Sequence, residues 1–200
     1  ITSYQLLFYL ALPLYSLIII SIPLISIVWI GHYERIFVIF GILLSIGGFL
    51  NTLAGPAYFS YLGIGELKWN LLSHIIMGLL NAGIGFLFGI LFGGVGVVIG
   101  WVISLSLGSS LIYISYHIKN KILLSELMPK SSRPMFFICL ISLFSIFFIF
   151  NLLNSKINNV LLNVFIILVF CAIIFVPFYS HPMRKQLIEW VNKYLFSKRI

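Results

Sequence analysis

The sequence predicts an all-α membrane protein, a polytopic helix bundle with six transmembrane helices followed by a C-terminal amphipathic helix. Of its 200 residues, 62 % are hydrophobic and 8 % are charged, and the mean hydropathy is +1.17. Soluble domains carry about 25 % charged residues, because a surface in water needs them. Lipid is therefore the expected solvent, and soluble, disordered, collagen-like and disulfide-rich secreted proteins are excluded.

Six apolar runs are each long enough for a helix that crosses the hydrocarbon core, which takes about 20 residues. They are approximately Leu6–Ile30, Ile36–Leu62, Trp69–Phe92, Val95–Ile118, Pro134–Leu153 and Val160–Phe178. The strands of a membrane β-barrel would instead alternate in hydrophobicity over about ten residues. We therefore expect helices, with residues 1–182 forming the bundle and residues 183–200 a basic amphipathic cytoplasmic tail.

The basic residues predict the orientation of these spans. With a cytoplasmic N-terminus, only Arg35 and Lys156 lie outside, and ten of the twelve basic residues lie inside. The inside set is Lys68, Lys119, Lys121, Lys130, Arg133, Arg184, Lys185, Lys193, Lys198 and Arg199. This bias follows the positive-inside rule and predicts that both ends are cytoplasmic. The net charge of +8 is then a sign of topology, and no nucleic-acid partner is expected.

The tail from Met183 has a different pattern. Apolar residues recur at helical spacing from Leu187 to Leu195, with basic and polar residues on the other face. Such helices lie at the cytoplasmic lipid surface, and Trp190 suits the interfacial belt. The alternative is a helix that docks on a partner protein.

Small residues form two rows on the third and fourth spans. The first row is Gly78, Ala82, Gly85, Gly89 and Gly93, and the second is Gly96, Gly100, Ser104 and Gly108. Each row lies on one helix face, where a neighbouring backbone can approach closely. Because only a short turn separates the rows, we expect an antiparallel hairpin, whose seam serves either static packing or movement during transport.

The second span carries a helix breaker and polar groups. Pro56 removes a backbone hydrogen bond and predicts a kink near Thr52. Asn51 and Thr52 are costly against lipid, and Asn81 lies about 18 Å along the next span, near the middle of the membrane. These side chains are candidates for the lining of a polar cavity, and hydrogen bonds between helices are the alternative.

No residue pattern predicts catalysis, a metal site or a bound cofactor. The spans hold no deep charged residue, and no Ser/His/Asp, Cys/His or metal-ligand spacing occurs. His32, His74 and His117 lie near the ends of spans, where anchoring at the interface is the expected role. Cys139 and Cys171 lie in apolar runs and are expected to be unpaired thiols.

An ordered set of motifs between residues 50 and 110 carries a family resemblance. The sequence NTLAGPAY at 51–58 is followed by GIGELKWN at 63–70, by NAG at 81–83 and by FGGVGVVIG at 92–100. This set resembles the later part of polysaccharide flippases of the multidrug/oligosaccharidyl-lipid/polysaccharide exporter superfamily. The resemblance covers about residues 1–120, and the last two spans fit the extra pair found in 14-helix members.

The resemblance implies the C-terminal bundle of a transporter of about 12–14 helices in the bacterial cytoplasmic membrane. Such a transporter moves undecaprenyl-pyrophosphate-linked oligosaccharide for O-antigen, capsule or exopolysaccharide assembly. The implied partners are this lipid-linked oligosaccharide, membrane lipids and proteins of polysaccharide assembly. The candidate cavity residues are Asn51, Thr52, Tyr58 and Asn81, with Pro56 at the kink and Arg35 and Lys68 as cations at the two mouths. Family cavities often hold deep basic residues, and this chain has none.

Three alternatives to the flippase stay open. The first is a drug or metabolite exporter of the same superfamily, and the second is a polytopic membrane enzyme of polysaccharide assembly. The third is a small membrane scaffold that is complete at six helices. Because the chain begins with Ile rather than Met, we expect a fragment or a processed product.

Overall fold

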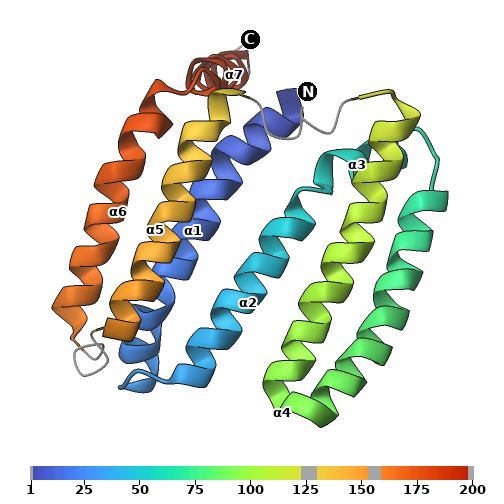
Figure 1. Cartoon of the computed structure of the whole chain (residues 1–200). Helices are drawn as coiled ribbons and strands as arrows, with labels where there is room; N and C mark the ends of the chain where they lie inside the picture. The colour runs from blue at the N-terminus through green and yellow to red at the C-terminus, as the bar shows by residue number, and fades with distance from the viewer. Residues whose placement is uncertain (1, 123–129, 153–158, 198–200) are drawn as a thin grey trace.

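The computed structural model describes residues 2–122, 130–152 and 159–197, and every regular element in these ranges is helical (Figure 1). The elements are α1 (Thr2–Ile30), α2 (Arg35–Thr52), α3 (Gly55–Gly63), α4 (Lys68–Lys119), the short 3-10 helix η2 (Lys130–Ser132), α5 (Arg133–Leu152), α6 (Val160–Ser180) and α7 (Met183–Ser197). The predicted all-α class is confirmed for this part of the chain.

Within the described ranges, four helices are long and apolar enough to cross a membrane, so the chain is a membrane protein. These segments are Ser3–Ile30, Arg35–Thr52, Lys68–Lys119 and Val160–Ser180. The count of six spans stays a prediction. The predicted outer cation Lys156 and the tail residues Lys198 and Arg199 lie outside the described residues.

Helix α4 is a hairpin of two arms rather than one rod. At Gly93 the backbone leaves the helical region, with φ +62° and ψ −147°, a conformation that only glycine adopts readily. The arms then run antiparallel on either side of this turn (Figure 1). The predicted hairpin between the third and fourth apolar runs is therefore confirmed.

The seam between the two arms depends on small residues. A Cβ atom added at Gly100 would lie 2.7 Å from the Cα of Gly85, so the two backbones are in direct contact there. Near the open end of the hairpin, the buried Ser73 hydroxyl donates to the carbonyl of Gly108 at 2.7 Å. All four members of the second predicted row are buried, whereas Gly78 and Ala82 of the first row are exposed. The first row thus enters the seam only in part.

The second predicted span differs from the expectation of one kinked helix. Helix α2 ends at Thr52, and a separate helix, α3, begins at Gly55 with Pro56 in its first turn. Pro56 has no N–H to offer the carbonyl of Thr52 four residues before it, which explains why the first helix stops there. The predicted kink near Thr52 is therefore confirmed, and it is a break between two helices rather than a bend within one helix over Ile36–Leu62.

Two cores hold the bundle, and α2 lies between them. One core joins α1, α5, α6 and the start of α7 around Phe8, Tyr9, Met135, Phe170 and Met183. The other joins α3 to the second arm of α4 around Ala57, Tyr61 and Ile112. Helix α2 packs against both α1 and α4 and so connects these two parts (Figure 1).

The described charges gather at one end of the bundle. This end holds the start of α1, the 64–67 connection, the last turn of α4, the start of α5 and α7 (Figure 1). Residues 31–34 and the Gly93 turn lie at the other end (Figure 1). Among the described Lys and Arg residues, all but Arg35 belong to the first end. The orientation relative to the cytoplasm stays a prediction.

Candidate functional site

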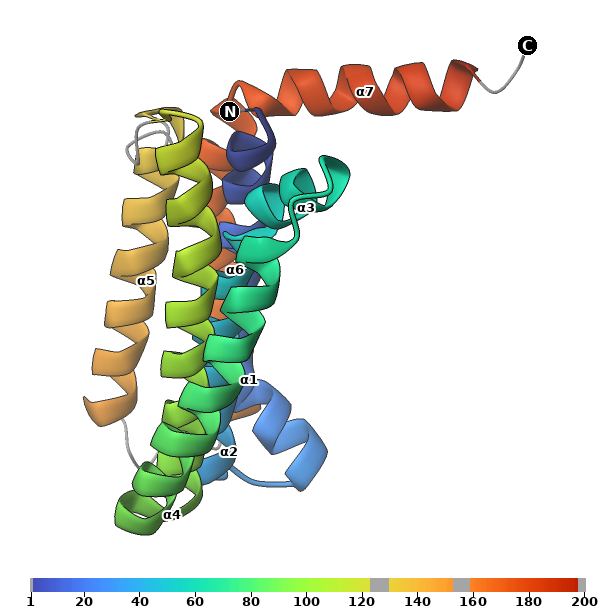
Figure 2. The same cartoon turned by 90° about the vertical axis from the view of Figure 1, so that its right-hand side faces the viewer.

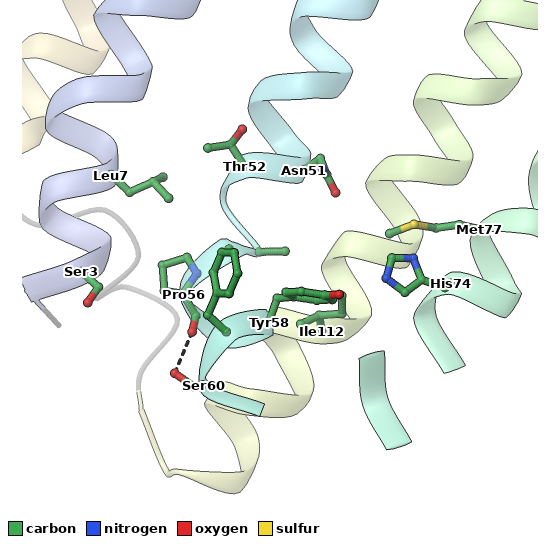
Figure 3. Close-up of a pocket in the computed structure, with 13 residues that line it drawn as sticks. Ser3, Leu7, Asn51, Thr52, Pro56, Tyr58, Ser60, His74, Met77 and Ile112 are labelled. Carbon is green, nitrogen blue, oxygen red and sulfur yellow. Dashed lines mark hydrogen bonds between the residues drawn. The ribbon is translucent and has the colours of Figure 1, made fainter. Parts of the chain in front are cut away.

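A pocket with several polar groups in a mostly apolar wall opens beside the break between α2 and α3. Its volume is about 790 Å³, and α1, α2, α3 and both arms of α4 contribute to its wall (Figure 3). The pocket exists because the break moves α3 away from the axis of α2, which leaves the last turn of α2 uncovered. It lies at the charge-rich end of the bundle.

Three of the four predicted cavity residues line this pocket. Asn51 and Thr52 come from the last turn of α2, and Tyr58 comes from α3, together with Pro56 (Figure 3). Residues from two separate helices therefore meet at one cavity, as expected for this segment of the sequence.

Asn51 is held on one side only. Its Oδ1 accepts a hydrogen bond from the Ser109 hydroxyl on the second arm of α4 at 2.8 Å. Among the described residues, its amide nitrogen has no hydrogen-bond partner, and the residue is exposed in the pocket. The side chain is thus oriented by Ser109 and keeps two N–H donors for a ligand.

Thr52 belongs to a short hydrogen-bond chain. Its hydroxyl donates to the carbonyl of Gly48 at 2.8 Å, and it accepts from the Tyr15 hydroxyl of α1 at 3.1 Å. This chain satisfies the Thr52 oxygen and ties the end of α2 to α1. Thr52 therefore stabilises the wall of the pocket, and its hydroxyl is already engaged within the protein.

Tyr58 contacts the first arm of α4 through its backbone and its ring. Its carbonyl accepts from the Asn70 amide nitrogen at 3.1 Å, and its ring meets the His74 imidazole edge-on with 5.8 Å between centroids. His74 lines the pocket together with Met77 (Figure 3). The position of His74 near the end of a span predicted an interfacial role, and the structure places it in the pocket wall.

A helical face connects the pocket to Asn81, which does not line it. Asn70, His74, Met77 and Asn81 recur at intervals of four, three and four residues, so they share one face of the first arm of α4. Asn81 is exposed and lies one turn beyond Met77 toward the Gly93 end. This spacing was the sequence signal that could have added His74 to the candidate set.

The two predicted mouth cations lie apart from the pocket wall. Arg35 is exposed at the start of α2, at the opposite end of the bundle. Lys68 is exposed at the start of α4, at the same end as the pocket, and its ammonium group lies 5.7 Å from the centre of the Trp69 ring. At this end Glu66 and Lys119 also form an ion pair.

His117 and the cysteines lie outside the pocket. His117 is 2 % exposed and meets the Tyr4 ring edge-on, so it is packed inside the bundle instead of anchoring at an interface. Cys139 and Cys171 are free thiols. The described residues also contain no group of three His, Cys, Asp or Glu side chains that would hold a metal ion.

The lining residues determine what the pocket can do chemically. Its described wall offers an amide, hydroxyl groups, an imidazole and aromatic rings, and no carboxylate. Such groups can hydrogen-bond to a polar ligand or contact it through their rings, while Leu7, Met77 and Ile112 add apolar contact. No family model, curated protein or solved structure matches this chain.

Proposed function

We propose that this chain is part of a membrane transporter that moves undecaprenyl-pyrophosphate-linked oligosaccharide across the bacterial cytoplasmic membrane. The observation that carries the proposal is the pocket at the α2–α3 break, a cavity whose mostly apolar wall holds amide, hydroxyl and imidazole groups, in a bundle of apolar helices. The motif resemblance between residues 50 and 110 supplies the substrate class. In this proposal the bundle has six spans, with both ends in the cytoplasm.

The chemistry of the pocket suits the sugar part of such a substrate. Asn51 and Ser60 carry amide and hydroxyl groups that hydrogen-bond to sugar hydroxyls, and Tyr58 and Phe59 add aromatic rings. Binding sites for small molecules have volumes of about 300–1,000 Å³, and this pocket, at about 790 Å³, lies within that range. Because these groups replace water around the glycan, they lower the cost of bringing it into the membrane.

The exposed polar face supports the presence of a second bundle. Asn51 and Asn81 are both exposed on segments that are long and apolar enough to span a membrane. Polar side chains within a membrane face a cavity or another helix, because contact with lipid is costly. We infer that a second bundle faces this surface and that the substrate passes between the two.

The break between α2 and α3 supplies a point at which the pocket can change shape. Only Leu53 and Ala54 connect the two helices, and the lost hydrogen bond at Pro56 lowers the resistance to bending. Alternating access needs such a hinge at the binding site. Movement of α3 relative to α2 would open or close the pocket toward the charge-rich end.

The test is substitution of the polar face in the full-length transporter. In a strain that lacks the gene, we expect Asn51→Leu combined with Asn81→Leu to reduce surface glycan by about tenfold or more, since two hydrogen-bonding groups at about 1 kcal/mol each are removed. Asn120→Leu, which lies past the end of α4 and outside the pocket, serves as the matched control. Normal glycan export by the double variant at normal abundance would refute the lining role.

A further inference from the structure

We propose that α7 is a binding surface for anionic phospholipid headgroups and lies flat on the membrane face at the charge-rich end of the bundle. The proposal concerns the lipid environment of the chain and is independent of the transported substrate. It rests on the direction of α7, the way its first turn is fixed, and the distribution of its side chains.

The direction of α7 differs from that of every neighbouring helix. Figure 2 shows α7 running crosswise to the long helices at the end of the bundle and projecting beyond it. A helix at this angle, placed where the spans end, runs along the membrane surface instead of across the bilayer. Residues 181–182 make the corner between α6 and α7.

The first turn of α7 is firmly fixed to the bundle. Met183 is 1 % exposed within the core shared by α1, α5 and α6. His181 Nε2 is 3.0 Å from the Ser132 hydroxyl, and the Met183 N–H donates to His181 Nδ1 at 3.2 Å. The Arg184 guanidinium also lies 3.7 Å from the centre of the Tyr179 ring. These contacts set the direction of α7, so its angle is a property of the folded chain.

Beyond this turn, the apolar face of α7 is mostly uncovered. Trp190 and Val191 are 49 % and 48 % exposed, and Leu187, which lies between them around the helix, is partly exposed. Trp190 borders an apolar groove along α1 that includes Leu10 and Leu14, so the side of α7 that carries Trp190 and Leu187 faces the direction in which the spans extend. In a bilayer, the same side meets the boundary between headgroups and acyl chains.

The charges on α7 select the kind of lipid. Lys185 and Lys193 are exposed and lie on the face away from Val191, with Glu189 as the acidic residue among them. The bundle end beside α7 carries the basic residues described above, and only Glu66 is acidic among the residues described at that end outside α7. An anionic headgroup layer complements this surface, whereas a zwitterionic layer offers only the apolar contact.

The first experiment measures the depth of α7 in vesicles. The full chain carries Cys171→Ala and Trp190→Cys, and Cys139 is 1 % exposed, so an environment-sensitive fluorophore reacts at position 190. In vesicles of phosphatidylcholine with phosphatidylglycerol, we expect quenching of this probe by brominated acyl chains. The quenching should weaken in pure phosphatidylcholine and at high salt. Asn192→Cys places the same probe on the opposite face of α7, where it should stay in water in both lipids.

The second experiment removes the charge that selects the lipid. We expect Lys185→Gln with Lys193→Gln to lower the preference for phosphatidylglycerol by about fivefold per lysine. Lys185→Arg with Lys193→Arg should keep the preference, and Lys121→Gln, outside α7, should change it least. Water exposure of the 190 probe in anionic vesicles would overturn the proposal. So would equal burial in both lipids that disappears when the protein is diluted, because it would assign this face to a second protein chain.

Discussion

At the scale of single residues, the α4 hairpin depends on glycines, which have no side chain to keep the two arms apart. The backbone of Gly100 contacts that of Gly85, and a Cβ atom added at Gly96 would lie closer still to the carbonyl oxygen of Phe88. Association of helices inside a membrane gains nothing from the hydrophobic effect, because lipid is as apolar as the side chains. Close backbone packing is therefore the main stabilising contact of this seam.

Gly100→Ala should destabilise the protein, because the added methyl group would meet the backbone of Gly85 at 2.7 Å and force the arms apart. We expect a loss of about 1–3 kcal/mol in the free energy of unfolding, measured by denaturant titration in detergent micelles. Gly78→Ala is the matched control, since an added Cβ there has no neighbour within 4 Å. The control should be neutral or stabilising, because alanine favours a helix over glycine by up to about 1 kcal/mol. Equal effects of both substitutions would contradict the packing role.

At the scale of elements, the corner between α6 and α7 is sensitive to proton uptake. Because Nδ1 of His181 accepts the Met183 N–H, its Nε2 carries the proton and donates to the Ser132 hydroxyl. Burial lowers the pKa of His181 below its ordinary value of about 6.5. A protonated imidazole would lose the acceptor at Nδ1 and with it one contact that fixes the start of α7.

The lowered pKa of His181 predicts a loss of stability in acid. As the pH falls below about 6.5, the unfolded chain binds the proton before the folded chain does, so the contribution of His181 is present at neutral pH and is lost as the pH falls through the lowered pKa of the folded state. We expect the melting temperature of the wild type to fall over this range and that of His181→Gln to fall less. His32→Gln, at an exposed position, should keep the wild-type dependence. An unchanged pH profile in His181→Gln would rule out this role.

The elements differ from their sequence-based bounds mainly at the α2–α3 break. Hydropathy predicted one span over Ile36–Leu62, because every residue near Pro56 is tolerated in an apolar helix. Pro56 predicted a disturbance one turn earlier, and α2 does end at Thr52. The size of the change in direction could not be predicted, since it depends on how Ala57 and Tyr61 of α3 pack against α4.

At the scale of the whole molecule, the alternating directions of the helices place most of the described charged residues at one end, with Glu34 and Arg35 at the other. The 64–67 connection and α7 lie at this end, and residues 31–34 lie at the other (Figure 1). Since basic residues are retained on the cytoplasmic side, the charge-rich end should face the cytoplasm.

Thiol labelling in intact cells tests this orientation. In a Cys171→Ala background, we expect a membrane-impermeant maleimide to label His32→Cys, which lies at the Arg35 end. It should label Ile64→Cys, 62 % exposed at the other end, only after the cells are opened. Labelling of Ile64→Cys in intact cells would reverse the predicted topology. Labelling of both positions would show that residues 32 and 64 lie on one side and would reduce the number of spans between them.

The candidate site was predictable in part. Asn51, Thr52 and Tyr58 are close together in the sequence near a helix breaker, so their meeting at one pocket follows from local structure. Ser109 and Tyr15, which hold Asn51 and Thr52, lie 58 and 37 residues away in the sequence. Nothing in the sequence pairs these side chains, because their contact depends on how α1 and the second arm of α4 pack beside α2.

Composition and hydrophobic runs determined that this protein is helical and lies in a membrane, because lipid leaves no partner other than the helix itself for the backbone polar groups. The glycine rows and the turn at Gly93 predicted the α4 hairpin, because both arms and the turn between them are neighbours in the sequence. Tertiary structure alone decided the pocket, the position of His74 in its wall, and the direction of α7. Each of these depends on contacts between helices distant in sequence, which local sequence patterns do not specify.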